Sequence, residues 1–186
     1  EALMTARPLK EIRIFDVDPE RLSSFVEKNR PLADRFGTKL VAAKSSDEAV
    51  EGADVITTVT TSRKPTFDGD RVKPGCHING VGSYTHEMRE IPVELLRRAG
   101  RIFVDNREAV LAEAGDFIIP MREGLFSSDR IAGELGELIL GQVPGRTSRD
   151  EITVMKTVGF ATLDIVAAAA IVEKAKTLGI GTEVAL

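Results

Sequence analysis

The chain has 186 residues, of which 42% are hydrophobic and 29% charged, and its formal net charge is −4. This length and composition are typical of one well-buried globular domain rather than two. The acidic balance provides no basic surface for a phosphate backbone, which argues against nucleic acid as a partner. The longest apolar run covers residues 165–172, whereas a membrane span needs about 20 residues, so we expect no membrane insertion.

The cysteine and histidine content excludes two further classes. Cys76 is the single cysteine, so no internal disulfide forms, and no Cys/His cluster has the spacing of a metal site. We therefore expect a reducing, cytoplasmic location and no metal. Cys76 is predicted to be a small buried residue, because no His and acid pair that could activate a thiol is recognisable nearby in the sequence.

In chain order, short runs rich in Val and Ile alternate with stretches that have helical character. The predicted strands are 11–16, 39–42, 54–60, 77–81, 101–104 and 152–158. Several of these runs are apolar on both faces, as a parallel sheet covered by helices requires.

Helix signals lie between these strands. Asp18 followed by Pro19 predicts the start of one helix, and Ser45 with Glu48 three residues later predicts a second. Three more helices, each followed by a glycine, are predicted over 93–99, 129–140 and 160–178. The β-α-β alternation indicates an α/β fold with a doubly wound, mostly parallel Rossmann-type sheet and right-handed crossovers.

Ligands of such sheets bind at the carboxyl ends of the strands. Asp16 closes the predicted strand 11–16, where a carboxylate can accept hydrogen bonds from the ribose hydroxyls of a dinucleotide. Its charge would repel a 2′-phosphate, which favours NAD over NADP. The alternative is a surface aspartate that caps the helix beginning at Pro19.

The glycine-rich turn of a dinucleotide fingerprint belongs about 20 residues before such an acid. None of the 16 glycines fits G-x-G-x-x-G, and counting back from Asp16 reaches a position before residue 1. We therefore expect a sheet truncated before its first strand and glycine-rich turn, with residues 1–6 as the tail of the first crossover helix. The chain is then expected to begin inside a longer sequence.

Several short motifs occur together in one order. They are HINGVG at 77–82, ELGE at 134–137, PGR at 144–146, VG at 158–159 with Asp164 downstream, and GIGT at 179–182. In this combination the chain resembles the ornithine cyclodeaminase/μ-crystallin family. The resemblance implies an NAD(P)-dependent oxidoreductase that acts at the Cα–N bond of an amino acid or cyclic imine.

The resemblance also implies an organisation and a partner. Residues 1–158 would form the dinucleotide-binding domain, and 159–186 would form a C-terminal helix and tail that return toward a separate substrate domain. The cofactor would be NAD, with NADP as an alternative, and the substrate a small amino acid or imine. The intact protein would be a homodimer.

Site residues follow from the same resemblance, position by position. The resemblance implies that Asp16 binds the adenosine ribose and that Thr60 contacts the adenosine side of the cofactor. The backbone of Val81, Gly82 and Ser83 would lie beside the nicotinamide. The hydroxyl of Thr157 would contact the carboxamide, and Val158 would border the substrate. Small residues allow the backbone to approach the cofactor, and a hydroxyl can serve an amide as donor or acceptor. The alternative for Thr60 is a β-branched residue that only stabilises its strand.

Two positions depart from the cyclodeaminase pattern, and no catalytic residue is assigned. Tyr84 stands where cyclodeaminases carry an aspartate used in proton handling, and Met88 stands where they carry a lysine. A phenol with a pKa of about 10 does not replace a carboxylate base at neutral pH. This favours an alanine dehydrogenase or ketimine reductase over an ornithine cyclodeaminase, with a noncatalytic binding protein as a further alternative. His86 is interpreted as a solvated loop residue and His77 as structural.

Overall fold

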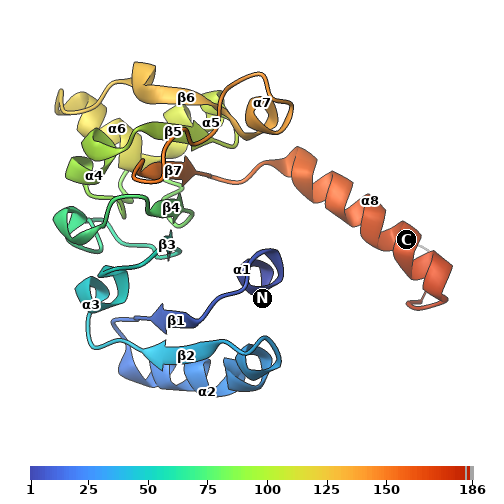
Figure 1. Cartoon of the computed structure of the whole chain (residues 1–186). Coiled ribbons are helices and arrows are strands. Elements are labelled where there is room, and N and C mark those ends of the chain that lie inside the picture. The colour runs from blue at the N-terminus through green and yellow to red at the C-terminus, as the bar shows by residue number, and fades with distance from the viewer. Residues whose placement is uncertain (183, 185–186) are drawn as a thin grey trace.

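The computed structural model describes residues 1–182 and 184. Residues 183, 185 and 186, at the end of the predicted segment 159–186, lie outside the described residues. The strands pair in parallel within two sheets, of order β1-β2 and β3-β4-β7-β5-β6. Their bounds are β1 (Glu11–Ile14), β2 (Lys39–Ala42), β3 (Val55–Thr58), β4 (His77–Gly80), β5 (Arg101–Val104), β6 (Ile131–Glu134) and β7 (Thr153–Lys156). The predicted α/β class with a parallel sheet is confirmed (Figure 1).

Helices connect the strands, and α2 and α3 start at the predicted cap residues. The bounds are α1 (Ala2–Ala6), α2 (Pro19–Arg35), α3 (Ser46–Val50), α4 (Val93–Arg98), α5 (Arg107–Glu113), α6 (Gly115–Arg122), α7 (Leu135–Ile139) and α8 (Ala161–Leu178). Asp18 caps α2 by accepting hydrogen bonds from the backbone N–H groups of Glu20 and Arg21. Ser45 caps α3 in the same way, and Gly179 ends α8 with a φ of 64°.

The core lies against one face of the five-stranded sheet. A row of aliphatic side chains in register crosses its strands, formed by Ile56, Ile78, Val154, Ile102 and Ile131. All five side chains are buried, and α4, α5 and α6 add Leu95, Leu96, Val110 and Phe117 to the same cluster. Each such side chain contributes about 1.5–3 kcal/mol when fully buried, so this row fixes the register of the strands.

The prediction of one helix over 129–140 was wrong. The segment forms a short 3₁₀ turn (Ser128–Arg130), then strand β6, and only then helix α7. Ile131 and Gly133 are buried where β6 pairs with β5, and a Cβ on Gly133 would lie 2.9 Å from a methyl carbon of Val143. Strand β6 has only four residues. Its pairing with β5 at the edge of the sheet therefore outweighs the helical propensity of the segment. Helices α5 and α6 were not predicted.

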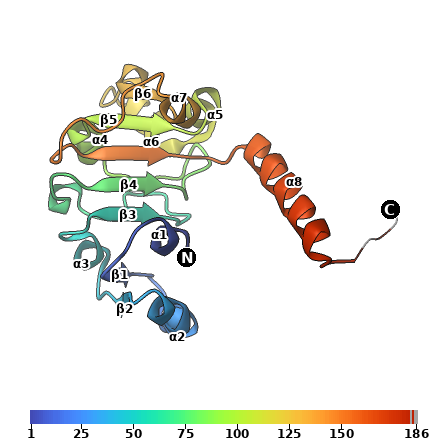
Figure 2. The ribbon, with the colours of Figure 1, turned by 45° about the vertical axis from the view of Figure 1, so that its right-hand side comes forward.

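Helix α8 projects away from the rest of the chain, as both ribbon views show (Figures 1 and 2). Apolar side chains along it are exposed, among them Leu163, Ile165, Val166, Ile171 and Val172. Within the described residues, no helix combines the length and the apolar character needed to cross a membrane.

Candidate functional site

The carboxyl ends of β3, β4, β7 and β5 meet at one edge of the sheet. Backbone hydrogen bonds connect them in that order: Val81 N donates to Thr58 O (2.9 Å), Thr157 N to Gly80 O (3.1 Å) and Asp105 N to Lys156 O (3.2 Å). The predicted residues Thr60, Val81, Gly82, Ser83, Thr157 and Val158 all follow these strand ends. The structure therefore gathers six of the predicted contacts on three neighbouring loops.

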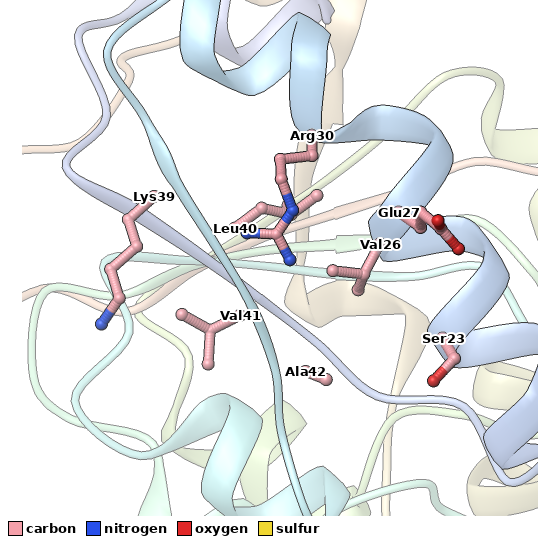
Figure 3. A pocket seen from close by; sticks show the side chains of 8 residues that line it. All are labelled: Ser23, Val26, Glu27, Arg30, Lys39, Leu40, Val41 and Ala42. Carbon is pink, nitrogen blue, oxygen red and sulfur yellow. The ribbon is translucent and has the colours of Figure 1, made fainter.

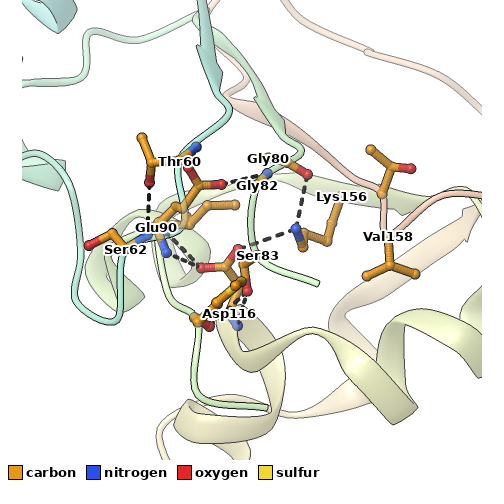
Figure 4. Close-up of polar contacts among 12 residues, drawn as sticks. Thr60, Ser62, Gly80, Gly82, Ser83, Glu90, Asp116, Lys156 and Val158 are labelled. Carbon is orange, nitrogen blue, oxygen red and sulfur yellow. Dashed lines mark hydrogen bonds and ion pairs between the residues drawn. The ribbon is translucent and has the colours of Figure 1, made fainter. Parts of the chain in front are cut away.

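A buried carboxylate joins the first two of these loops. Glu90 is 0% exposed, and its two carboxylate oxygens accept hydrogen bonds from Thr60 N (2.5 Å) and Gly82 N (2.7 Å) (Figure 4). A Cβ on Gly82 would lie 2.1 Å from Thr60 O and 2.4 Å from Thr60 N, so the close approach of the loops requires glycine.

Asp116 holds the backbone of Glu90 and is itself paired with the buried Lys156. Asp116, at the start of α6, accepts hydrogen bonds from Glu90 N (2.7 Å) and Ile91 N (2.8 Å) with one oxygen. Its other oxygen lies 3.4 Å from Nζ of Lys156, which also donates to Gly80 O (3.1 Å). Burial raises the pKa of Asp116 and lowers that of Lys156, while each charge opposes the shift of the other. A buried carboxylate, an ion pair and four backbone N–H groups thus form one network.

The side chains of the second loop divide between the interior and the surface. The Ser83 hydroxyl is buried, donates to Met88 O (2.7 Å) and accepts from Asp116 N (3.3 Å), so it stabilises the loop. Val81 and Tyr84 are exposed by 39% and 50%. These two side chains are therefore accessible to a ligand, whereas the Ser83 hydroxyl is not.

Asp105, which the sequence analysis did not select, organises the third loop. One carboxylate oxygen accepts hydrogen bonds from the Thr157 hydroxyl, Val158 N (3.1 Å) and Gly159 N (3.1 Å). The predicted carboxamide ligand Thr157 thus donates its hydroxyl proton to Asp105, and its oxygen also accepts from Gly159 N (3.1 Å). Asp105 directly follows strand β5, much as Asp16 closely follows β1. An acidic residue at the carboxyl end of a predicted strand was therefore a signal that could have identified Asp105.

Asp16 lies beyond the end of β1, on the two-stranded sheet. One oxygen accepts a hydrogen bond from Asp18 N (2.9 Å), and the other lies 3.9 Å from a guanidinium nitrogen of Arg21. Its side chain is 30% exposed. Asp18 is the residue that caps α2, and both contacts of Asp16 are with the start of this helix. Within the part of the chain that the structure describes, the second oxygen has this one long ion-pair contact and accepts no hydrogen bond.

His77, Cys76 and His86 are the remaining candidate groups. The two ring nitrogens of His77 lie 2.8 Å from Thr153 Oγ1 and 3.1 Å from Asn79 Oδ1, and burial lowers the pKa of His77. Burial raises the pKa of Cys76 to about 11, so its thiol stays protonated at neutral pH. His86 is exposed, with a ring nitrogen 2.6 Å from Ala112 O. Among the described residues, no group of His, Cys, Asp and Glu could hold a metal ion.

An open groove of about 650 Å³ lies between α2 and β2 (Figure 3). It is lined by Ser23, Val26, Glu27, Arg30, Lys39, Leu40, Val41 and Ala42. Its walls belong to the two-stranded sheet and its covering helix rather than to the loops after β3, β4 and β7. The groove therefore lies apart from the candidate site at those strand ends.

The fold places this chain among the parallel α/β domains, a class in which ligands generally bind at the carboxyl ends of the strands. Comparison with known proteins narrows the class. The model of the ornithine cyclodeaminase/mu-crystallin family matches residues 1–178, and the chain belongs to that family. The resemblance inferred from the motifs is thereby confirmed.

Individual relatives agree with this family. A Delta(1)-pyrroline-2-carboxylate reductase of Bacillus cereus is 35% identical over 184 residues, covering 99% of this chain and 55% of that protein. The ketimine reductase mu-crystallin of Mus musculus is 39% identical over 159 residues, covering 86% of this chain and 45% of that protein. The chain thus spans about half the length of the curated relatives it matches.

A solved structure is similar over nearly the whole chain. The Delta(1)-pyrroline-2-carboxylate reductase of Thermococcus litoralis, in complex with NADH and L-proline, matches with a TM-score of 0.91 and 35% identity. The match covers 98% of this chain and 55% of that one.

Proposed function

We propose that the chain is the NAD(H)-binding part of an imine reductase, which transfers hydride at the Cα–N bond of a small amino or imino acid. The observation that carries the proposal is the match, at a TM-score of 0.91, to a reductase structure in complex with NADH and L-proline. In the forward direction the C=N carbon would accept a hydride and the nitrogen would accept a proton. NAD(H), when bound, supplies or accepts the hydride.

The observed side chains fit this cofactor at its adenosine end. Asp16 would accept hydrogen bonds from the ribose hydroxyls with the oxygen that lies 3.9 Å from the guanidinium of Arg21. Its negative charge would disfavour a 2′-phosphate, which supports NAD rather than NADP. Thr60, exposed after β3, would contact the adenosine side.

The nicotinamide end would lie against the second and third loops. Val81, Gly82 and Ser83 would present the backbone beside the ring, and Val158 would border the substrate. Thr157 would contact the carboxamide through its oxygen, because its proton already goes to Asp105. This last role is narrower than the donor-or-acceptor role expected from the sequence.

Tyr84 supports reduction rather than cyclodeamination. The phenol is half exposed at the position where cyclodeaminases have an acid, and cyclodeamination needs several proton transfers, each accelerated about 10²–10⁴-fold by a positioned acid or base. The substrate would be a cyclic ketimine such as pyrroline-2-carboxylate, or the imine formed from pyruvate and ammonia.

We also propose the division into residues 1–158, which hold the cofactor, and residues 159–186, which reach another part of the protein. The exposed apolar side chains of α8 support this division, because a face of this kind is stabilised by packing against protein. Pairing of two full-length copies and a cytoplasmic location belong to the same proposal.

The test is a side-by-side assay of the full-length protein with NADH and pyrroline-2-carboxylate, with NADH, pyruvate and ammonia, and with NAD⁺ and ornithine. We expect NADH oxidation with one of the two imines and little proline from ornithine. Rapid proline formation from ornithine, or NADH binding with no turnover of any substrate, would refute the proposal.

A further inference from the structure

Three segments distant in sequence are joined beneath the candidate site. Arg89 N donates to Ser62 O (2.8 Å) and Thr66 N to Glu90 O (2.9 Å), which joins the loop after β3 to the segment before α4. Gly115 N donates to Thr85 O (3.0 Å), so the start of α6 is fixed to the same segment. The buried charges of Glu90, Asp116 and Lys156 lie where these segments meet (Figure 4).

We propose that Glu90, Asp116 and Lys156 act as an internal clamp that positions the loops after β3, β4 and β7 for the cofactor, with Glu90 as its central positioning residue. The inference rests on the proposed function, because the cofactor that the loops would hold is NAD(H). It adds three residues that do not face the cofactor themselves.

The bonding pattern of Glu90 requires a carboxylate. Each of its oxygens accepts one N–H, and the two N–H groups, of Thr60 and Gly82, belong to different loops. A glutamine at this position has one oxygen and one NH₂ group, so it can accept from only one of the two amides. Burying a charge is costly, and an apolar side chain of similar volume would fill the space at lower cost. The carboxylate therefore serves to orient these two amides.

The ion pair extends the clamp to the third loop. Lys156 is the last residue of β7, directly before Thr157, and it is bound by Asp116 and by Gly80 O. A Cβ on Gly80 would lie 2.6 Å from Cδ1 of Ile91 and 3.4 Å from Cδ of Lys156, so the glycine leaves the space through which both side chains pass. The charge cluster thus holds the first two loops and the end of β7, from which the third loop starts.

The clamp limits which backbone amides a ligand can bind. The N–H groups of Thr60 and Gly82 point to Glu90 and are not available to a ligand. A cofactor at these loops is therefore recognised by carbonyl oxygens, side chains and the remaining amides. Accurate placement of the loops, rather than additional hydrogen bonds, is what Glu90 contributes.

The test compares Glu90→Gln and Glu90→Asp in the full-length protein with Glu94→Gln, which makes the same charge change at an exposed position of α4. Steady-state kinetics at varied NADH and varied imine give both KM values and kcat. We expect Glu90→Gln to raise the KM for NADH about 10–100-fold, the fold-change that loss of a hydrogen bond to a charged group produces. The KM for the imine and all constants of Glu94→Gln should stay within about twofold of wild type.

Glu90→Asp keeps the charge and both acceptors but is one methylene shorter, so we expect it to restore part of the loss. It also carries the test if Glu90→Gln does not fold. A residue needed only for folding would lower kcat through the amount of active protein and leave the KM for NADH unchanged, and that result in a folded variant would overturn the clamp. Absence of NADH turnover in the wild type would instead refute the proposed function.

Discussion

Gly82→Ala is the substitution whose effect the structure specifies most closely. The added Cβ would meet Thr60 O at 2.1 Å, Thr60 N at 2.4 Å and Glu90 Oε1 at 2.7 Å. Two of these atoms belong to backbone, so the loop after β3 has to move away. That movement breaks the hydrogen bonds through which Glu90 holds Thr60 N and Gly82 N.

Each of these bonds reaches a charged acceptor and contributes about 1.5–3 kcal/mol, so we expect Gly82→Ala to lower the free energy of unfolding by about 3–6 kcal/mol. This is a large part of the stability of an ordinary domain. Urea unfolding of the full-length protein, followed by circular dichroism, measures the change.

Gly136→Ala is the matched control, because a Cβ at this position of α7 meets nothing within 4 Å. Alanine is favoured over glycine in a helix by about 0.5–1 kcal/mol, so this variant should be as stable as wild type or slightly more stable. If Gly82→Ala unfolds within about 1 kcal/mol of wild type, the close packing of the two loops is refuted.

Three other substitutions test the buried ion pair, His77 and Asp16. Lys156→Met should lower the free energy of unfolding by about 3–5 kcal/mol, because it leaves the Asp116 carboxylate buried without its partner. Burial already raises the pKa of Asp116, which favours its protonated form, so denaturant titrations should show a smaller loss of stability at low pH. A loss of stability that does not depend on pH would contradict this. Burial lowers the pKa of His77 below its ordinary value of 6.5, so the contribution of His77 to stability is present above pH 6.5 and is lost as the pH falls below that value. The difference in unfolding free energy between wild type and His77→Gln should therefore shrink on acidification. A difference that stays constant with pH would contradict this prediction. Asp16→Ser should weaken NADH binding by about 1.5–3 kcal/mol and narrow the preference over NADPH, which fluorescence titration measures, and an unchanged affinity would exclude Asp16 from the ribose site.

The parallel sheet was predictable because its signals are local. The strands 39–42 and 101–104 were predicted with the bounds that the structure shows, since each is a short apolar run between helix signals. The starts of α2 and α3 followed from cap residues, which act within one helical turn. Strand β6 was missed, because its four residues form a strand only by pairing with β5.

The polar loops were predictable from motifs, whereas the charges beneath them were not. Glu90 is 30 residues from Thr60 in the chain, and charged residues usually lie at the surface, so only the tertiary structure reveals its burial. One signal was available for Lys156. It continues the inward-facing alternation of Ile152, which directly precedes β7, and Val154, within β7, so an apolar residue is expected at its position. A charge at such a position indicates a buried partner.

The most direct test of the central claim is a crystal structure of the full-length protein with NADH. We predict that the cofactor lies across the carboxyl ends of the strands, with its ribose at Asp16 and its nicotinamide against Val81–Ser83 and Thr157. Glu90 should still hold the amides of Thr60 and Gly82. NADH bound elsewhere, for example in the groove between α2 and β2, or bound by those two amides in place of Glu90, would contradict it.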